Sequence, residues 1–118
     1  MMCENLIESK AKAFALRVIK LYKYLQRKRE PVMCKQVLRA GTSIGANVAE
    51  GQFAQTRADF LSKYAIALKE ASETRYWIDL LDESGYLPDT ESSRSLRLDC
   101  DELIRLLVAS IKTAKRNA

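Results

Sequence analysis

Residues 38–51 read Leu-Arg-Ala-Gly-Thr-Ser-Ile-Gly-Ala-Asn-Val-Ala-Glu-Gly, with a small residue at every fourth position from Gly41 to Ala49. The apolar residues of this stretch recur with the spacing of an amphipathic helix. A glycine inside a helix costs about 1 kcal/mol relative to alanine, so keeping two of them needs a reason. The usual reason is that another helix approaches the backbone more closely than larger side chains allow. We therefore predict a helix-packing seam at Gly41, Gly45 and Ala49, with Asn47 and Glu50 as a buried polar network beside it.

The sequence on both sides of this segment is also helical in pattern, with clear signals where each helix starts and stops. Residues 4–28 carry an apolar stripe with alternating four-residue and three-residue steps. Pro31 suits the first turn of the next helix, and Thr56 followed by Asp59 resembles a capping box. Gly85 and Pro88 turn the chain, with Asp89 or Thr90 as the next N-cap. We expect helices over about residues 4–28, 31–50, 57–84 and 90–116.

The connections between these helices are short, which favours antiparallel neighbours. The sequence shows no strand alternation, internal repeat or low-complexity tract. We therefore predict one all-α domain over residues 1–118, folded as an antiparallel up-down-up-down four-helix bundle.

Composition argues against most kinds of catalytic and metal site. The chain has no histidine, and its three cysteines are far apart, so neither a zinc site nor a histidine-based catalytic group is expected. Glu70 and Glu73 lie on one helix side, but the di-iron bundle pattern also needs histidine, so pairing with Lys69 or Arg75, or capping of polar groups at a helix interface, is favoured. The glycine-rich run lacks the lysine of a phosphate loop. We predict a non-enzymatic protein without metal or cofactor.

Apolar runs in the chain are only a handful of residues long, so we expect no membrane span. The first residues lack the basic and apolar regions of a signal peptide. These features predict a cytoplasmic protein.

The charge is positive overall but unevenly distributed. Of a net +5, residues 1–48 hold ten Lys and Arg against three acids, whereas residues 49–93 hold four against nine. A row of cations on the outer face of a helix can neutralise successive phosphates, which gives salt-sensitive binding to RNA or DNA with little dependence on sequence. The alternative is an ordinary solvated face. The predicted nucleic-acid-binding residues are Lys12, Lys20, Lys23 and Arg27 on the first helix and Arg105, Lys112 and Arg116 on the fourth.

Apolar residues also occur outside the predicted core stripes, over a wider arc than a monomeric bundle needs. Surplus apolar patches of this kind usually mark a partner surface, although single exposed leucines are common. We predict self-association through Leu16, Ile19, Trp77, Leu80, Ile104 and Val108.

Three stretches together resemble a known family. They are Arg39-Ala-Gly-Thr-Ser-Ile-Gly-Ala-Asn-Val-Ala-Glu-Gly51, the run from Asp59-Phe-Leu-Ser-Lys-Tyr to Arg-Tyr-Trp77, and Ile111-Lys-Thr-Ala-Lys115. The chain resembles, from about residue 7 to 116, the bacterial four-helix-bundle family encoded in intervening sequences of 23S rRNA genes. That family is similar to the accessory variability protein of diversity-generating retroelements.

This resemblance implies a small cytoplasmic bundle that assembles as a homopentameric ring and has no enzymatic activity. In the retroelement relatives, the basic ring binds nucleic acid and a reverse transcriptase. The alternative function is therefore a structural or adaptor oligomer that recruits a protein partner such as a reverse transcriptase.

Overall fold

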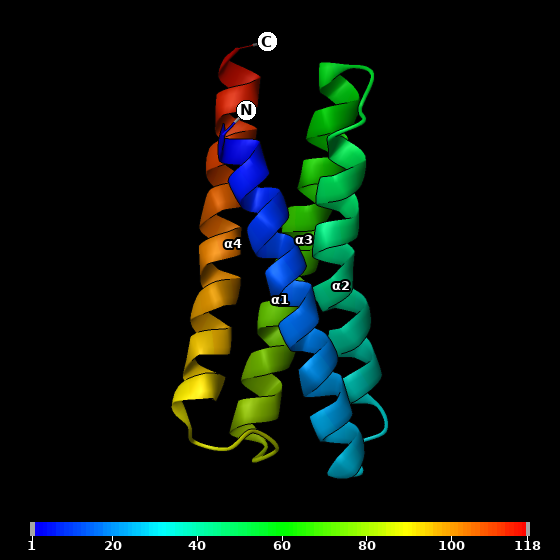
Figure 1. The fold of residues 1–118 in the computed structure, drawn as a ribbon, viewed down its shortest axis with the longest axis vertical. Coiled ribbons are helices and arrows are strands. Elements are labelled where there is room, and N and C mark those ends of the chain that lie inside the picture. Colours follow the sequence, from blue (N-terminus) through cyan, green and yellow to red (C-terminus); the bar gives the residue numbers. More distant parts are fainter. Residues whose placement is uncertain (1, 118) are drawn as a thin grey trace.

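The computed structural model describes residues 2–117, and it describes the side chains of residues 6–117. The chain forms four helices: α1 (Met2–Arg27), α2 (Met33–Gly51), α3 (Arg57–Glu83) and α4 (Glu91–Arg116). Residues 2–117 contain no strand, so the predicted all-helical class and the four predicted helices are confirmed. Successive helices run up and down the long axis, and α1 begins at the end of the molecule where α4 finishes (Figure 1).

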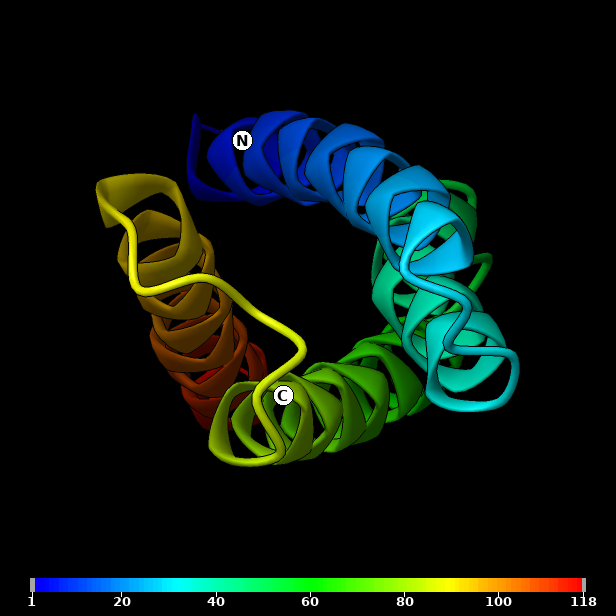
Figure 2. The ribbon, with the colours of Figure 1, turned by 90° about the horizontal axis from the view of Figure 1, so that it is seen from below.

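Seen along its long axis, the bundle has its helices at the corners of a square (Figure 2). α1 adjoins α2 and α4, and α3 adjoins the same two helices. The diagonal pairs are held apart by the core side chains. The outer faces of α1 and α3 therefore lie on opposite sides of the molecule.

The predicted stripes supply the core. All six positions of the apolar stripe of α1 are buried, namely Ile7, Ala11, Phe14, Val18, Leu21 and Leu25. α4 contributes its own stripe from Leu96 to Ser110, and α3 adds Tyr64, one of the largest fully buried side chains. Burial of these apolar side chains is the main favourable contribution to folding.

The helix ends follow local chemistry. Thr56 Oγ1 accepts a hydrogen bond of 3.1 Å from the backbone N–H of Asp59, as the capping-box pattern predicts. Of the two N-cap candidates for α4, Thr90 is the cap, because its Oγ1 accepts from the N–H of Ser93 at 3.2 Å. Gly85 has a φ of +86° just after α3, where the N–H of the next residue reaches the carbonyl of Leu81 at 2.9 Å.

One predicted boundary is wrong. Pro31 is exposed and lies before α2, which begins at Met33 rather than at residue 31. Glu30 explains the difference, because its buried carboxylate accepts a 2.9 Å hydrogen bond from the N–H of Cys34 and so caps α2 from outside the helix. Arg29 precedes it with a φ of 60°, a left-handed conformation that only glycine adopts at no steric cost.

The predicted seam brings α2 against α1 at two of its three positions. A Cβ added to Gly41 would lie 2.7 and 2.8 Å from the two γ-carbons of Val18, so the helices touch there. A Cβ on Gly45 would meet the carbonyl oxygen of Ala11 at an ordinary 3.5 Å. Ala49 is exposed and takes no part in the seam.

The polar residues beside the seam form no buried network. Asn47 is half-buried, and its amide donates to the carbonyl of Ser43 one turn earlier in the same helix, at 2.9 Å. Glu50 is exposed and pairs with Lys63 of α3 at 3.1 Å. Both residues lie on the outer part of α2, where an intrahelical carbonyl satisfies Asn47 and Lys63 of α3 pairs with Glu50.

Candidate nucleic-acid interface

Ion pairs between helices use many of the chain's acidic residues. Between α1 and α4, Lys10 binds Glu102 at 3.1 Å and Arg17 binds Asp99 at 2.6 Å. These contacts tie the first helix to the last at two levels of the bundle. Each of these side chains is partly exposed, so we expect only a modest contribution from each pair to stability.

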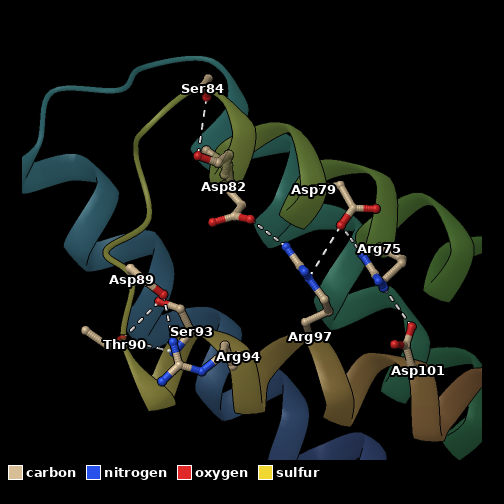
Figure 3. Close-up of polar contacts among 11 residues, drawn as sticks. Arg75, Asp79, Asp82, Ser84, Asp89, Thr90, Ser93, Arg94, Arg97 and Asp101 are labelled. Carbon is tan, nitrogen blue, oxygen red and sulfur yellow. Dashed lines mark hydrogen bonds and ion pairs between the residues drawn. The ribbon is translucent and has the colours of Figure 1, made fainter.

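A second group of ion pairs joins α3 to α4 (Figure 3). Arg75 donates from Nε to Asp101 at 2.7 Å and from Nη1 to Asp79, and Arg97 donates to Asp82 at 2.6 Å. Two carboxylates of the acidic residues 49–93, Asp79 and Asp82, and Asp101 of α4 are thus bound to arginines between α3 and α4. They do not offset the cations on the outer faces of α1 and α4.

Arg39, in the signature segment of α2, holds two carboxylates of α3. Its guanidinium donates to Glu70 at 2.8 Å and also to Glu73, and the indole N–H of Trp77 donates to Glu73 at 2.9 Å. The pKa of Glu73 is lowered, first by the Trp77 hydrogen bond and then by Arg39. The carboxylates thus pair with a cation at a helix interface, as expected, but the cation is Arg39 of α2 rather than Lys69 or Arg75, because helical spacing within α3 cannot show which residue of α2 faces it.

The seven predicted nucleic-acid-binding cations are all exposed. None of them forms an ion pair or side-chain hydrogen bond with any other residue whose side chain the structure describes. In contrast, most of the cations that lie between helices are paired. The outer faces of α1 and α4 therefore carry uncompensated positive charge.

These cations form two ridges rather than one stripe. On α1 they extend from Lys12 to Arg27, about 22 Å at the helical rise per residue. On α4 they extend from Arg105 to Arg116, about 16 Å. α1 and α4 adjoin, but Arg27 is in the last turn of α1 and Arg116 in the last turn of α4, and those two helix ends lie at opposite ends of the bundle (Figure 1).

Two of the predicted self-association residues lie within the α1 ridge. Leu16 is 55% exposed and Ile19 is 36% exposed. Leu16 is four residues from both Lys12 and Lys20, so all three share one helix face. The α1 face therefore combines apolar and cationic side chains.

The other predicted self-association residues are more covered. Trp77, Leu80, Ile104 and Val108 are half-buried, and Trp77 and Ile104 pack against the core of their own chain. In addition to the half-buried Leu80, α3 exposes Tyr76 one turn earlier and Ile66 nearer its start, and neither was among the predicted self-association residues. Their exposure depends on how α3 is rotated in the bundle, and no local pattern reveals that rotation.

Two of the cavities that open on the surface of the bundle adjoin α4. One, of about 500 Å³, lies where α3 begins and α4 ends, and Arg57 there donates to the carbonyl of Ala114 at 2.7 Å. The other, of about 320 Å³, lies between α1 and the start of α4 and includes Lys20 of the α1 ridge in its lining. Sequence reasoning identified neither cavity, because both are formed by segments far apart in the chain.

Other kinds of site find little support in the described residues. They contain no group of three or more histidine, cysteine or acidic side chains that could hold a metal ion. None of the described helices is both long and apolar enough to cross a membrane. Cys34 and Cys100 are buried free thiols, and burial raises the pKa of Cys100 to about 12, so it is not a nucleophile at neutral pH.

Comparison with known proteins finds a matching family and a similar solved structure. The family model described as "23S rRNA-intervening sequence protein" matches residues 4–109. A crystal structure described as a protein with unknown function from the S23 ribosomal protein family of Bacteroides thetaiotaomicron VPI-5482 is 47% identical. It matches with a TM-score of 0.89, and the alignment covers 93% of this chain and 98% of that chain. No curated protein matches the chain.

Proposed function

The chain belongs to the 23S rRNA-intervening sequence protein family, as its motifs predict, and from that premise we propose a backbone-binding function. In this proposal it is a non-enzymatic, self-associating cytoplasmic bundle that binds RNA or DNA through the outer faces of α1 and α4. Recognition is of the sugar–phosphate backbone rather than of base sequence.

The observation that carries this proposal is the separation of paired from unpaired charge. Most acids of α3 and α4 are held by arginines or lysines of neighbouring helices, while the cations of the two outer ridges have no partner among the described side chains. Unpaired exposed cations can neutralise phosphates and so release the counterions condensed on a nucleic acid, and that release favours binding at low salt. Each ridge is long enough to meet several successive phosphates.

Self-association would multiply these ridges. The resemblance to the retroelement relatives favours a homopentameric ring, and a ring would repeat both ridges around one axis. The α3 face that exposes Tyr76 and Ile66 is the better candidate for contact between copies, because Lys69 is the sole cation among its neighbouring exposed residues. Burying the α1 face instead would cover Lys12 and Lys20 and remove them from a nucleic acid.

Binding can be tested by fluorescence anisotropy of a labelled oligonucleotide across a salt series. Affinity should fall steeply with salt and change little with base sequence. Changing Lys20, Lys23 and Arg27 together to glutamate should weaken binding on the order of tenfold or more and reduce the salt slope. No binding at low salt by the unaltered protein would contradict the proposal.

A single-site pair controls for net charge. Lys23→Glu and Lys35→Glu change the net charge equally, and both lysines are exposed without an ion pair to a described side chain. Only the first should reduce affinity markedly, because Lys35 lies on α2, outside the two ridges and outside the α3 face proposed for contact between copies. Equal losses would show that net charge alone governs binding. Light scattering after gel filtration tests assembly: a species at the 13.4 kDa of one chain would rule out the ring.

The second candidate function is an adaptor oligomer that recruits a protein, such as a reverse transcriptase. The observation in its favour is exposed apolar surface: Phe53 in the α2–α3 connection is 86% exposed, in addition to Leu16 on α1. Large exposed aromatic side chains are typical anchors of protein interfaces. A defined partner that stays bound after nuclease treatment and at high salt would favour this function.

A further inference from the structure

We propose that the cavity between α1, the α3–α4 connection and the first turn of α4 holds one unpaired nucleotide of a single-stranded nucleic acid. The base would lie against Tyr24 and the apolar floor, with an adjacent phosphate at Lys20. The inference rests on the proposed function, because the α1 ridge brings the strand to the cavity. It adds a preference for single strands that a purely backbone-binding surface does not have.

The cavity is the place where the core reaches the surface. Its floor consists of Leu21, Leu87 and Leu96, which keep 8, 8 and 5% of their surface exposed. Every other buried apolar residue among those described is exposed by 2% or less. An apolar floor left open to solvent in an otherwise closed core favours an apolar or flat occupant.

The size of the cavity suits a small organic group. Its volume is about 320 Å³, at the lower end of the range for ligand pockets, about 300 to 1,000 Å³. A single nucleotide is of this scale. Tyr24 and Pro88 stand on the lining and offer flat surfaces to a base.

The rim supplies positive charge and free polar groups. Lys20 on the α1 side is exposed and has no ion pair among the described side chains, and the Ser92 hydroxyl on the α4 side likewise has no hydrogen-bond partner there. Lys28 adds charge near the cavity, since its ammonium lies 5.6 Å from the centroid of the Tyr24 ring. The rim therefore attracts an anionic group rather than a neutral apolar molecule.

Arg17 fixes one wall of the cavity. Its guanidinium donates to Asp99 at 2.6 Å, to Ser95 at 2.8 Å and to the carbonyl of Ser92 at 3.0 Å. The charge of Arg17 is thus balanced by Asp99, which leaves Lys20 as the cation available to a phosphate. These three contacts hold α1 and the start of α4 at a fixed separation.

Two acids adjoin the lining residues in sequence: Asp89 is paired, whereas Glu91 is exposed and forms no ion pair with a described side chain. Asp89 follows Pro88, and its carboxylate accepts a 2.7 Å hydrogen bond from Arg94 on the first turn of α4 (Figure 3). Thr90 and Ser93 are occupied by capping α4. The cavity itself has no unpaired carboxylate among its lining residues to repel a phosphate.

The position of Lys20 connects the cavity to the α1 ridge. Lys20 belongs to both, and Lys23 follows less than one helical turn later on the outer face. A strand whose phosphates follow the ridge can place one base in the cavity without leaving the cations. A duplex keeps its bases paired inside and cannot do so. Stacking of a base on an aromatic side chain is tolerant of sequence, as the proposed function requires.

The test compares one single-stranded oligonucleotide with its duplex, using anisotropy at constant salt. The informative variant is Tyr24→Leu, which keeps an apolar side chain of similar burial but cannot stack with a base. The matched control is Tyr22→Leu, a half-buried tyrosine on the same helix that does not line the cavity and accepts a hydrogen bond from Gln26 at 2.9 Å. Circular dichroism checks that both variants are folded.

We expect Tyr24→Leu to weaken single-strand binding about fivefold or more, the effect of one lost base stack, with duplex affinity and the salt slope within twofold of wild type. Tyr22→Leu should change neither. An equal loss for strand and duplex, or no loss with Tyr24→Leu, overturns the nucleotide cavity and leaves backbone binding intact. Absence of binding to either by wild type overturns both proposals. If adenosine monophosphate displaced the strand and bound with the same affinity as the strand, the proposal would be overturned, because the cavity would then be a site for a free nucleotide.

Discussion

Replacing two glycines of the same helix by alanine should have opposite effects on stability. Gly41 and Gly45 are four residues apart on α2, and both face α1. Gly41→Ala places a methyl group 2.7 Å from a γ-carbon of Val18, whereas Gly45→Ala places it 3.5 Å from the carbonyl oxygen of Ala11. The same chemical change therefore meets a forbidden contact at one site and an ordinary contact at the other.

The magnitudes follow from two opposing terms. Alanine favours a helix over glycine by about 1 kcal/mol at either site. At Gly41 the new carbon is about 0.7 Å nearer than an ordinary contact of 3.4 Å, and Val18 is fully buried and β-branched, so it cannot turn away. Overpacking of this kind costs about 1–3 kcal/mol. We expect Gly45→Ala to stabilise by up to about 1 kcal/mol and Gly41→Ala to destabilise by up to about 2 kcal/mol.

Urea unfolding followed by circular dichroism measures both free energies of unfolding. All variants are compared at one protein concentration, because assembly would make the apparent stability depend on it. In thermal scans, the two variants should differ in Tm by several degrees, since about 1 kcal/mol corresponds to about 4 °C for a chain of this size.

A double variant isolates the contact with Val18. In Gly41→Ala combined with Val18→Ala, the methyl group on residue 41 fills part of the space that the valine leaves. The loss should therefore be smaller than the sum of the two single losses, by about 1 kcal/mol or more. Equal stability of Gly41→Ala and Gly45→Ala, or additive losses in the double variant, would refute a close contact at Gly41.

Three further predictions concern single side chains. Arg29→Gly should raise the free energy of unfolding by up to about 1 kcal/mol, because glycine adopts the φ of 60° without strain; an unchanged urea midpoint would contradict this. The pKa of Glu73 is lowered in the folded state, so its carboxylate stabilises the fold above the ordinary pKa of about 4.5. This stabilisation is lost as the pH falls through the pKa of the folded state. Glu73→Gln should therefore lose less stability than wild type in acid unfolding below about pH 4.5. Cys100 should resist alkylation by iodoacetamide at pH 8 until the protein unfolds, because its buried thiol has a pKa of about 12; rapid labelling of native protein, located by mass spectrometry, would contradict its burial.

The helices themselves could be predicted because their signals are local. The four-and-three spacing of apolar residues, the threonine caps at Thr56 and Thr90, and the stop at Gly85 each act within one or two turns of the chain. Pro31 was misplaced because Glu30 competes for the start of α2. A buried glutamate that caps a helix from outside has no distinctive pattern in sequence.

The candidate site was only partly predictable. The cations of α1 and α4 could be named because outward-facing positions follow from helical periodicity once the core stripe is known. Their lack of partners could not be known beforehand, because pairing depends on which residues the neighbouring helices present. Arg39 is exposed on α2, yet it holds Glu70 and Glu73, whereas exposed Lys20 holds no carboxylate of the described residues.

The sequence by itself determined the four helices, all their ends but the start of α2, the apolar stripes and the small residues that let α2 approach α1. These properties depend on interactions between residues close together in the chain. The tertiary structure alone decided that Gly41 is tightly enclosed while Gly45 is not, that the acids of α3 are held by arginines of other helices, and that Leu21, Leu87 and Leu96 share an open cavity. Each of these depends on the rotation and offset of one helix against another, which packing of the whole core fixes and no single helix specifies.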